Sequence, residues 1–343
     1  MKLQHSFLPH IEAATAATAL RWVIGWTYFS AFWRRTALAV KLDPDAAGYI
    51  GEKFNHFLPN ALGIGPLIEY LVLNPDVLHI AMVIFTVVEG IVGLFLILGL
   101  FTRLMSIGVV GLAMGILLGS GWIGTTCLDE WQIGVLGVAG GFILLLIGSG
   151  KFSLDSLFFS KGFAFTQTNR FRWFASGELP LSKSVLNKIA LGGAAVALAL
   201  TLFTNQYFHG GVWGTLHNKS VNPKIEIYDA RLSENELEFE IYRVEGVDVY
   251  GSFLIDISLY GENNERLLHL NQTDLAGLPP RQIQNRYVAK VRPHKYSMVV
   301  PLGAKALIKL KHEINLDSKS KYFNLVLTDI SGAEWKVKIN YDK

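Results

Sequence analysis

Residues 77–100 read VLHIAMVIFTVVEGIVGLFLILGL, a run in which Glu89 is the only acidic residue and no lysine or arginine occurs. A helix needs about 20 mainly apolar residues to cross the hydrocarbon core of a bilayer. The length and composition of this run therefore predict a transmembrane helix.

Similar runs on either side predict four more transmembrane helices, at residues 15–33, 104–123, 131–149 and 185–204. We expect a four-helix membrane domain over residues 1–160, with a long outer loop at 34–76. A basic cytoplasmic linker at 161–184 and a single fifth transmembrane helix at 185–205 should follow. Within the outer loop, residues 62–73 are apolar but too short to span, which favours an interfacial or re-entrant helix.

The composition of the whole chain agrees with a membrane protein and excludes several other classes. Hydrophobic residues make up 51% and charged residues 17% of the 343 residues, and the net charge is only +3. No basic stripe of the kind that binds nucleic acid is visible. Cys127 is the single cysteine, which excludes an intrachain disulfide, a four-cysteine zinc site and a cysteine-ligated iron–sulfur cluster.

Lysine and arginine in short loops set the orientation of a membrane protein. The connection after the fourth predicted helix is basic, and Arg103 lies in the tight turn between the second and third. Both belong in the cytoplasm. We therefore expect a multi-pass protein of the cell (inner) membrane, with a cytoplasmic N-terminus and everything after Thr204 outside.

The pattern changes to a period of two residues from Lys224 onward. Seven segments alternate apolar and polar residues: KIEIYDA, ELEFEIYR, SFLIDISLY, YSMVVPL, KALIKLKH, YFNLVLTD and EWKVKINY. Short alternating strands separated by turn residues predict an antiparallel β-sandwich of immunoglobulin-like size. The expected fold class is membrane α plus all-β, with the extracytoplasmic β domain at residues 206–343.

Two charged residues fall inside predicted membrane helices, where charge is costly. Arg21 lies about two turns from the inner end of the first helix, and Glu89 lies near the middle of the second. We expect them to form a buried structural pair. The alternative is a functional role in a proton path.

Arg34, Arg35 and Lys41 lie at the outer end of the first helix. Two guanidinium groups and an ammonium group suit a small oxyanion. The alternative is that these side chains snorkel beside Asp43 and Asp45.

Residues 119–134 read GSGWIGTTCLDEWQIG, with Cys127 at the expected start of the fourth helix and Asp129 and Glu130 in its first turn. A thiol at a helix N-terminus near cations is more easily ionised and more reactive. The alternative for a lone cysteine is inert packing.

Residues 206–223 read QYFHGGVWGTLHNKSVNP and follow the fifth helix. We expect this segment to close the anion pocket through His217 and Lys219. The alternative is a linker, and two histidines with a lysine do not define a metal site.

These residues resemble a known family. The stretches LRWVIGWTYFSAFWRR, VVEGIVGLFLILGLFTRLMSIG and TTCLDEWQIG resemble DoxD, the DoxX-like membrane subunit of thiosulfate:quinone oxidoreductase. The stretch GGVWGTLHNKSVNP before a β domain is similar to the DoxA subunit. The resemblance covers nearly the whole chain. It implies a DoxD–DoxA fusion that oxidises thiosulfate to tetrathionate and passes two electrons to a membrane quinone.

We combine this implied reaction with the residues above. Arg34, Arg35, Lys41, His217 and Lys219 are the candidate thiosulfate ligands, and Cys127, Asp129 and Glu130 are the candidate catalytic residues. Candidates for the quinone or proton path are Arg21, Glu89, His79 and Trp26. Quinone is the expected acceptor, and the absence of flavin, haem and metal motifs favours polar two-electron chemistry.

Three alternatives remain open at this point. Thiosulfate sulfur either attacks the quinone directly or forms an intermediate on Cys127. The donor is either thiosulfate or another sulfur oxyanion. The chain is either an enzyme or a non-enzymatic membrane scaffold whose sandwich binds a partner, because the sandwich fold alone does not decide function. The sequence leaves homodimer formation open.

Overall fold

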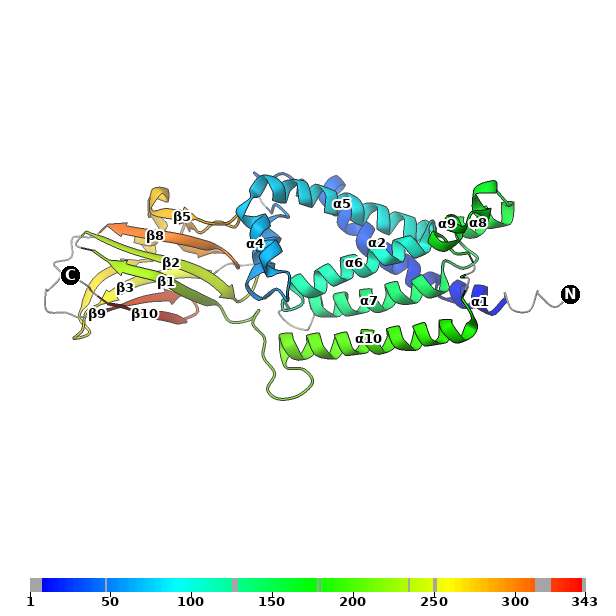
Figure 1. Ribbon diagram of the computed structural model, residues 1–343. Coiled ribbons are helices and arrows are strands. Elements are labelled where there is room, and N and C mark those ends of the chain that lie inside the picture. Colours follow the sequence, from blue (N-terminus) through cyan, green and yellow to red (C-terminus); the bar gives the residue numbers. More distant parts are fainter. Residues whose placement is uncertain are drawn as a thin grey trace. The chain divides into compact units, whose positions relative to one another are not determined.

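The computed structural model describes residues 8–46, 48–124, 129–177, 179, 181–233, 235–248, 252–311 and 322–340. They form two compact units (Figure 1). The helical unit contains the described parts of 1–49, 79–121 and 128–217. The sandwich unit contains the described parts of 50–78, 122–127 and 218–343. The predicted combination of a membrane α region with an all-β region is confirmed.

Four described helices are long and apolar enough to cross a membrane: α5 (Pro75–Leu98), α6 (Thr102–Ser120), α7 (Asp129–Ile147) and α10 (Lys183–His209). They coincide with four of the five predicted spans, and the protein is therefore a multi-pass membrane protein. The shorter helices of this unit are α1 (Leu8–Ala16), α2 (Thr18–Trp33), α8 (Leu154–Lys161), η3 (Ala164–Gln167) and α9 (Asn169–Phe174).

The fifth predicted span, at residues 15–33, falls on α2. This helix has 16 residues, and by its own length it is not among the four candidate spans. It continues directly into a five-residue π-helix, η1 (Arg34–Leu38). The Ala39 amide donates to the Arg34 carbonyl at 3.1 Å, so the helical path extends beyond α2 itself.

Glycines set how α2 lies against α5. A Cβ atom added to Gly25 would lie 2.9 Å from the Gly93 carbonyl oxygen, and one added to Gly90 would lie 2.7 Å from the Phe32 ring. Small residues let helix backbones approach closely in a membrane. Residue numbers rise along α2 while those of their α5 partners fall, so the two helices are antiparallel.

A buried carboxylate ties the connection after α7 to the start of α6. Asp155, in α8, is fully buried and accepts hydrogen bonds from the Phe101 amide at 2.9 Å and the Thr102 amide at 3.1 Å. The Ser176 hydroxyl donates to it at 2.8 Å. Because the first amides of a helix lack intrahelical partners, Asp155 acts as a cap for α6 from a distant part of the chain.

Arg103 adds to the same buried corner from α6. Its guanidinium donates to the carbonyls of Leu145 at 3.1 Å, Arg172 at 3.1 Å and Ala175 at 3.3 Å. The sequence predicted Arg103 only as an orientation signal, but its side chain also holds the segment around α9 in place.

The β region is an antiparallel two-sheet sandwich, as predicted. One sheet has the strand order β1-β2-β8-β5, and the other has the order β10-β9-β3-β7-β6 with β4 paired to β3. The strands are β1 (Lys224–Leu232), β2 (Glu236–Glu245), β3 (Ser252–Tyr260), β4 (Arg266–Asn271), β5 (Ile283–Asn285), β6 (Arg292–His294), β7 (Ser297–Val300), β8 (Lys305–Lys311), β9 (Tyr322–Asp329) and β10 (Glu334–Asn340). The region between β4 and β5 adds α11 (Gln272–Ala276) and η4 (Pro280–Gln282).

Alternating side chains from both sheets fill the sandwich core. Phe239, Ile308, Leu254 and Leu325 are fully buried there. The seven alternating segments predicted from the sequence are all strands. The segments missed are β4, β5 and β6, of which the last two have only three residues each, too few for a periodic signal.

The middle of the predicted outer loop belongs to the sandwich unit. It forms α3 (Glu52–Phe57), η2 (Leu58–Asn60) and α4 (Gly65–Leu73). A short helix forms within 62–73, as α4 shows, and its predicted interfacial or re-entrant position stays a prediction. The sequence did not predict that this segment folds with the β-strands.

Asn55 of α3 makes the most buried of these contacts. Its side chain is fully buried, donates to the Gly303 carbonyl at 3.1 Å and accepts from the Ala289 amide at 3.0 Å. In addition, the Tyr287 hydroxyl donates to Glu69 at 2.8 Å. A buried amide that satisfies two backbone groups fixes the position of its segment.

Asp248 links the same loop to the end of β2. The Lys53 ammonium lies 2.5 Å from its carboxylate, and His56 Nδ1 lies 3.8 Å away, which is too long for a hydrogen bond. The His56 imidazole and the Lys53 ammonium hold the pKa of Asp248 well below its usual range. Ionised Asp248 therefore stabilises the folded sandwich unit.

We expect Asp248→Asn to lower the free energy of unfolding by about 1 kcal/mol at pH 7, because Lys53 is partly exposed. A depressed folded-state pKa contributes stability above the unfolded value, near 3.9, and that contribution declines as the pH falls below it. The difference in melting temperature from the parent should stay constant from about pH 8 to 5 and shrink below about pH 4.

The control for this prediction is Glu238→Gln, which removes a more exposed pair with Lys309 at 3.3 Å. It should change the melting temperature less. A difference for Asp248→Asn that grows as the pH falls from about 8 to 6 would contradict the prediction, because an interaction that needs a charged His56 becomes stronger at lower pH.

Candidate functional site

The strongest candidate site in the helical unit is an ion pair between Arg35 of η1 and Glu89 of α5. The exposed fractions of the two side chains are 16% and 5%. Arg35 also lies 3.4 Å from the Thr86 hydroxyl and 5.9 Å from the centre of the Phe85 ring. A carboxylate at this depth of a spanning helix is costly unless it is paired or has a function.

The two adjacent arginines of the π-helix η1 differ in exposure and partner. Arg35 is turned toward Glu89, whereas Arg34 is exposed. A π-helical turn is wider than an α-helical turn and is frequent at functional sites. The charge of Arg34 also acts on the Glu89 carboxylate. Arg34, Arg35 and Glu89 thus form one ion pair, Arg35–Glu89, with Arg34 as an additional cation.

The predicted pair between Arg21 and Glu89 is wrong. Arg21 instead donates to the carbonyls of Leu96 at 2.6 Å, Ile97 at 2.7 Å and Phe152 at 2.6 Å. The physical reason is the glycine contact between α2 and α5, which places Arg21 beside the C-terminal end of α5. Arg21 satisfies carbonyls that lack partners at a helix end, and Glu89 is left to Arg35.

Trp26 and His79, the other residues predicted for the quinone or proton path, lie in the same unit. Neither is among the described contacts of the Arg35–Glu89 pair. Trp26 is 56% exposed, as expected for a side chain that faces lipid. His79 is half-buried, and its Nδ1 atom has no hydrogen-bond partner among the described residues. Lys41, a predicted anion ligand, is exposed after η1.

The predicted catalytic segment is described only in part. Asp129 and Glu130 form the first turn of α7, as the sequence predicts. Cys127 and the preceding Thr125 and Thr126 lie outside the described residues. The role of Cys127 therefore stays a prediction.

Residues 206–223 divide between the two units. His217 is exposed in the helical unit, where its amide donates to the His209 carbonyl at 3.1 Å. Lys219 lies in the sandwich unit, and its ammonium donates to Asn60 at 2.8 Å. In the structure Lys219 thus has a protein partner from the outer loop.

Sequence reasoning missed the two neighbours of Lys219. Asn218 donates to the Gly124 carbonyl at 2.7 Å, and the Ser220 hydroxyl accepts from the Gly124 amide at 3.0 Å. All three lie in the sandwich unit. The signal available in the sequence was the Asn-Lys-Ser stretch itself, because short polar side chains bond to nearby backbone. That signal does not reveal a partner almost a hundred residues away.

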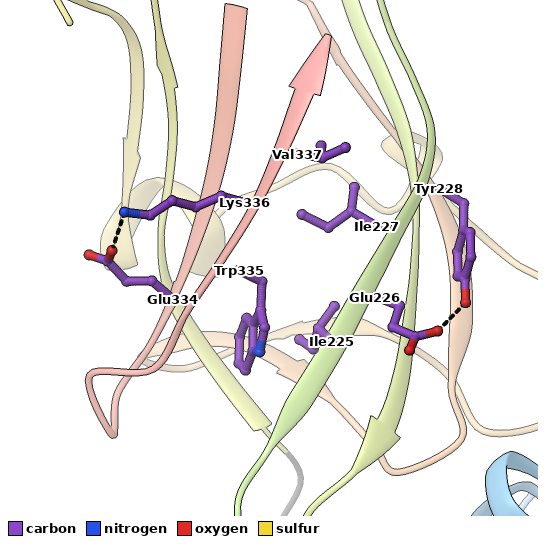
Figure 2. Close-up of a pocket in the computed structure, with 8 residues that line it drawn as sticks. All are labelled: Ile225, Glu226, Ile227, Tyr228, Glu334, Trp335, Lys336 and Val337. Atoms are coloured by element: carbon purple, nitrogen blue, oxygen red, sulfur yellow. Dashed lines mark hydrogen bonds and ion pairs between the residues drawn. The ribbon is translucent and has the colours of Figure 1, made fainter.

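An open groove lies between the edge strands β1 and β10 of the sandwich (Figure 2). Its volume is about 460 Å³, and apolar side chains share its lining with an ion pair between Lys336 and Glu334 at 2.9 Å. Figure 2 also shows the Tyr228 hydroxyl directed to Glu226. None of the eight described lining residues is among those predicted to carry chemistry.

Among the described residues, no three His, Cys, Asp or Glu side chains gather in a way that could hold a metal ion. The Arg35–Glu89 pair and the exposed Arg34 beside it suit anion binding and proton transfer.

Comparison with protein families agrees with the two parts of the chain. Residues 17–182 match the family of the TQO small subunit DoxD, and residues 208–338 match the family of the TQO small subunit DoxA. TQO denotes thiosulfate:quinone oxidoreductase. Together the two matches span most of the sequence. The chain belongs to the DoxD and DoxA families and joins both small subunits of this oxidoreductase in one polypeptide.

Proposed function

We propose that this protein oxidises thiosulfate with a membrane quinone as electron acceptor. Two thiosulfate dianions, one quinone and two protons give one tetrathionate dianion and one hydroquinone. One sulfur–sulfur bond forms between the two sulfane sulfurs, and the two electrons released reduce the quinone. The observation that carries this proposal is the ion pair between Arg35 of η1 and Glu89 of the spanning helix α5, in a DoxD-family chain.

The reaction consumes two protons at the quinone, so the site needs an acid that can reach a lipid-soluble substrate. Glu89 lies on α5, which is apolar enough to cross the bilayer. Carboxyl groups at bilayer depth commonly belong to proton paths. We assign Glu89 to proton delivery and Arg35 to holding its side chain in place.

Binding of the thiosulfate dianion requires positive charge beyond that already balanced by Glu89. Arg34 supplies it, since its side chain is exposed directly beside Arg35. Lys41 follows on the same segment and adds a second exposed cation. We propose these groups as the first contacts of thiosulfate, with His217 of the same unit as a further ligand.

Two routes to the sulfur–sulfur bond are considered. In the first, the Cys127 thiolate and a thiosulfate sulfane sulfur form a thiosulfonate, and the two electrons reduce the quinone. A second thiosulfate then attacks that sulfur and releases tetrathionate and the thiolate. In the second, the sulfane sulfur of one thiosulfate bonds to a quinone oxygen, and the other oxygen takes up a proton. A second thiosulfate attacks that sulfur, the sulfur–oxygen bond breaks, and hydroquinone leaves with the second proton. Asp129 and Glu130 would relay protons in either route.

We further propose that the protein lies in the cell membrane with its N-terminus inside and the sandwich outside. The basic side chains of the α7–α10 connection support this orientation. Thiosulfate would then bind from the extracytoplasmic side, while quinone enters from the bilayer.

The proposal is tested by anaerobic mixing of the purified protein with thiosulfate and a soluble quinone. Quinone absorbance and tetrathionate are measured together. One tetrathionate per hydroquinone is the expected result. Quinone reduction with sulfite but not thiosulfate would assign a different sulfur oxyanion, and no turnover with either donor would favour the scaffold alternative.

We expect Arg34→Gln to raise the KM for thiosulfate about 10-fold or more, because a charge-assisted contact contributes about 1.5 to 3 kcal/mol. The kcat should change less, since Arg34 binds substrate and does not carry the proton. Initial rates at varied thiosulfate concentration check this.

The matched control is Arg170→Gln, which removes an exposed arginine of α9. It should leave the KM unchanged. Equal KM values for the parent and Arg34→Gln would show that Arg34 only snorkels at the membrane surface.

A further inference from the structure

The segment that follows α10 gathers exposed apolar side chains at one place. Residues 210–217 read GGVWGTLH and contain no lysine, arginine, aspartate or glutamate. They belong to the helical unit. Val212, Trp213 and Leu216 are exposed, and the exposed fractions of the last two are 69% and 76%. Exposed apolar side chains that lie together mark an interaction surface.

This segment is held in a defined turn by the side chain of Gln206. The Gln206 Oε1 atom accepts from the Val212 amide at 3.2 Å and the Trp213 amide at 3.0 Å, and its Nε2 atom donates to the Trp213 carbonyl at 3.2 Å. The His217 amide donates to the His209 carbonyl at 3.1 Å, which closes the segment onto the end of α10 (Figure 1). Both backbone polar groups of Trp213 therefore have protein partners and do not require water.

The length of α10 places this segment near a surface of the bilayer. Lys188 is the last lysine, arginine, aspartate or glutamate of α10, and its side chain is exposed. Such a charge lies near one membrane interface, and the hydrocarbon core takes up about 20 residues of helix beyond it. Counted from Lys188, the opposite interface falls at the last turn of α10, where the segment begins.

The last turns of α10 already present aromatic rings away from the protein interior. Phe203 and Tyr207 are exposed one turn apart, and their stacked rings have centres 6.2 Å apart. Gln206, which holds Trp213, is the residue next to Tyr207. Tyrosine and tryptophan are enriched at membrane interfaces, where the ring is in an apolar environment and its polar atom meets water. The segment thus continues a surface that a spanning helix presents to lipid.

We propose that residues 212–216 form an interfacial anchor, in which Trp213 and Leu216 enter the boundary between headgroups and acyl chains at the C-terminal end of α10. The partner is the lipid surface itself. The lack of charge in the segment permits this depth, and the bonds from Gln206 remove the cost of unpaired peptide groups there. The anchor does not depend on the reaction proposed above.

The test uses the full-length protein in nanodiscs of phosphatidylcholine, either unmodified or with bromine atoms near the headgroup end of the acyl chains. Bromine quenches tryptophan fluorescence only at short range. The chain has eight tryptophans, so the emission of the parent minus that of Trp213→Phe gives the signal of Trp213. Trp213→Tyr serves the same subtraction if Trp213→Phe does not fold.

We expect the brominated lipid to remove at least about half of the Trp213 emission, because an interfacial indole contacts the upper part of the acyl chains. The matched control is Trp131→Phe. Trp131 lies in the same unit and donates to Thr204 of α10 at 2.9 Å, but it is buried, so its emission should fall much less.

Gln206→Ala releases the backbone of Trp213 and should weaken this quenching, because insertion would then leave peptide groups unpaired. The double variant Gln206→Ala/Trp213→Phe supplies the subtraction. Trp26→Phe is the positive control, since Trp26 is exposed on α2.

Equal Trp213 emission in the two lipids would overturn the proposal. Blue-shifted Trp213 emission without quenching would also overturn it, and would assign the surface to a protein partner such as a second copy of the chain. Neither thiosulfate nor quinone is present in these measurements, so their outcome is separate from that of the proposed function.

Discussion

Glu89→Gln is expected to lower kcat for quinone reduction at least about 100-fold, because a neutral amide cannot deliver a proton from this position. It should also destabilise the protein by about 3 kcal/mol, since removal of one partner of a buried pair leaves the other charge uncompensated. The measurements are the turnover rate with saturating substrates and the melting temperature of the purified protein.

The double variant Arg35→Gln/Glu89→Gln separates the two effects. Removal of both charges should recover part of the lost stability, because no uncompensated charge remains. Turnover should stay as low as in Glu89→Gln. A double variant with parental turnover would leave the pair with a structural role only.

Glu69→Gln is the matched control for Glu89→Gln. Glu69 accepts a hydrogen bond from Tyr287 in the sandwich unit at 2.8 Å. The same substitution there should affect stability without a 100-fold loss of turnover. The comparison thus distinguishes loss of a carboxylate in general from loss of the one at the proposed proton path.

The sequence predicts which residues are costly in the membrane but not their partners. Arg21 and Glu89 both stood out because charge is rare in apolar runs. Whether two such residues meet depends on how far α2 is shifted along α5. Close contacts at Gly25, Gly90 and Gly93 set that shift. Hydropathy does not carry that information, so the partner of Glu89 could only be found in the structure.

The partners of residues in the outer loop could not be predicted from local sequence patterns either. The length of apolar runs predicted the four spans that the structure bears out, and alternation with a period of two predicted the seven strands, because both signals are local. The placement of 50–78 with the sandwich depends instead on single polar residues such as Asn55, whose partners are over 200 residues away. Contacts of this kind leave no periodic trace in the sequence.

The division into compact units does not follow the family boundaries. Asn55, Asn60 and Gly124 fall in the part of the chain that matches DoxD, whereas their partners at Gly303 and Asn218–Ser220 fall in the part that matches DoxA. Stretches of both families therefore fold together in the sandwich unit. In physical terms, the two family regions of this chain share hydrogen bonds within one folded unit.

Cys127→Ser is expected to lower turnover at least about 100-fold if the covalent route holds, because a serine hydroxyl is not ionised at neutral pH and cannot carry the sulfur-bound intermediate. Intact mass spectrometry of the parent after one thiosulfate and one quinone should then show a thiosulfonate adduct. The Ser variant should show none.

Direct addition of thiosulfate to quinone predicts a different pair of results. The Ser variant would keep most of its turnover, and the parent would carry no adduct when quenched in acid. Glu89→Gln provides the reference, since it should stop proton delivery in both routes and lower turnover whether or not Cys127 reacts. Near-parental turnover of Cys127→Ser together with low turnover of Glu89→Gln would assign the chemistry to the quinone itself and give Cys127 a packing role.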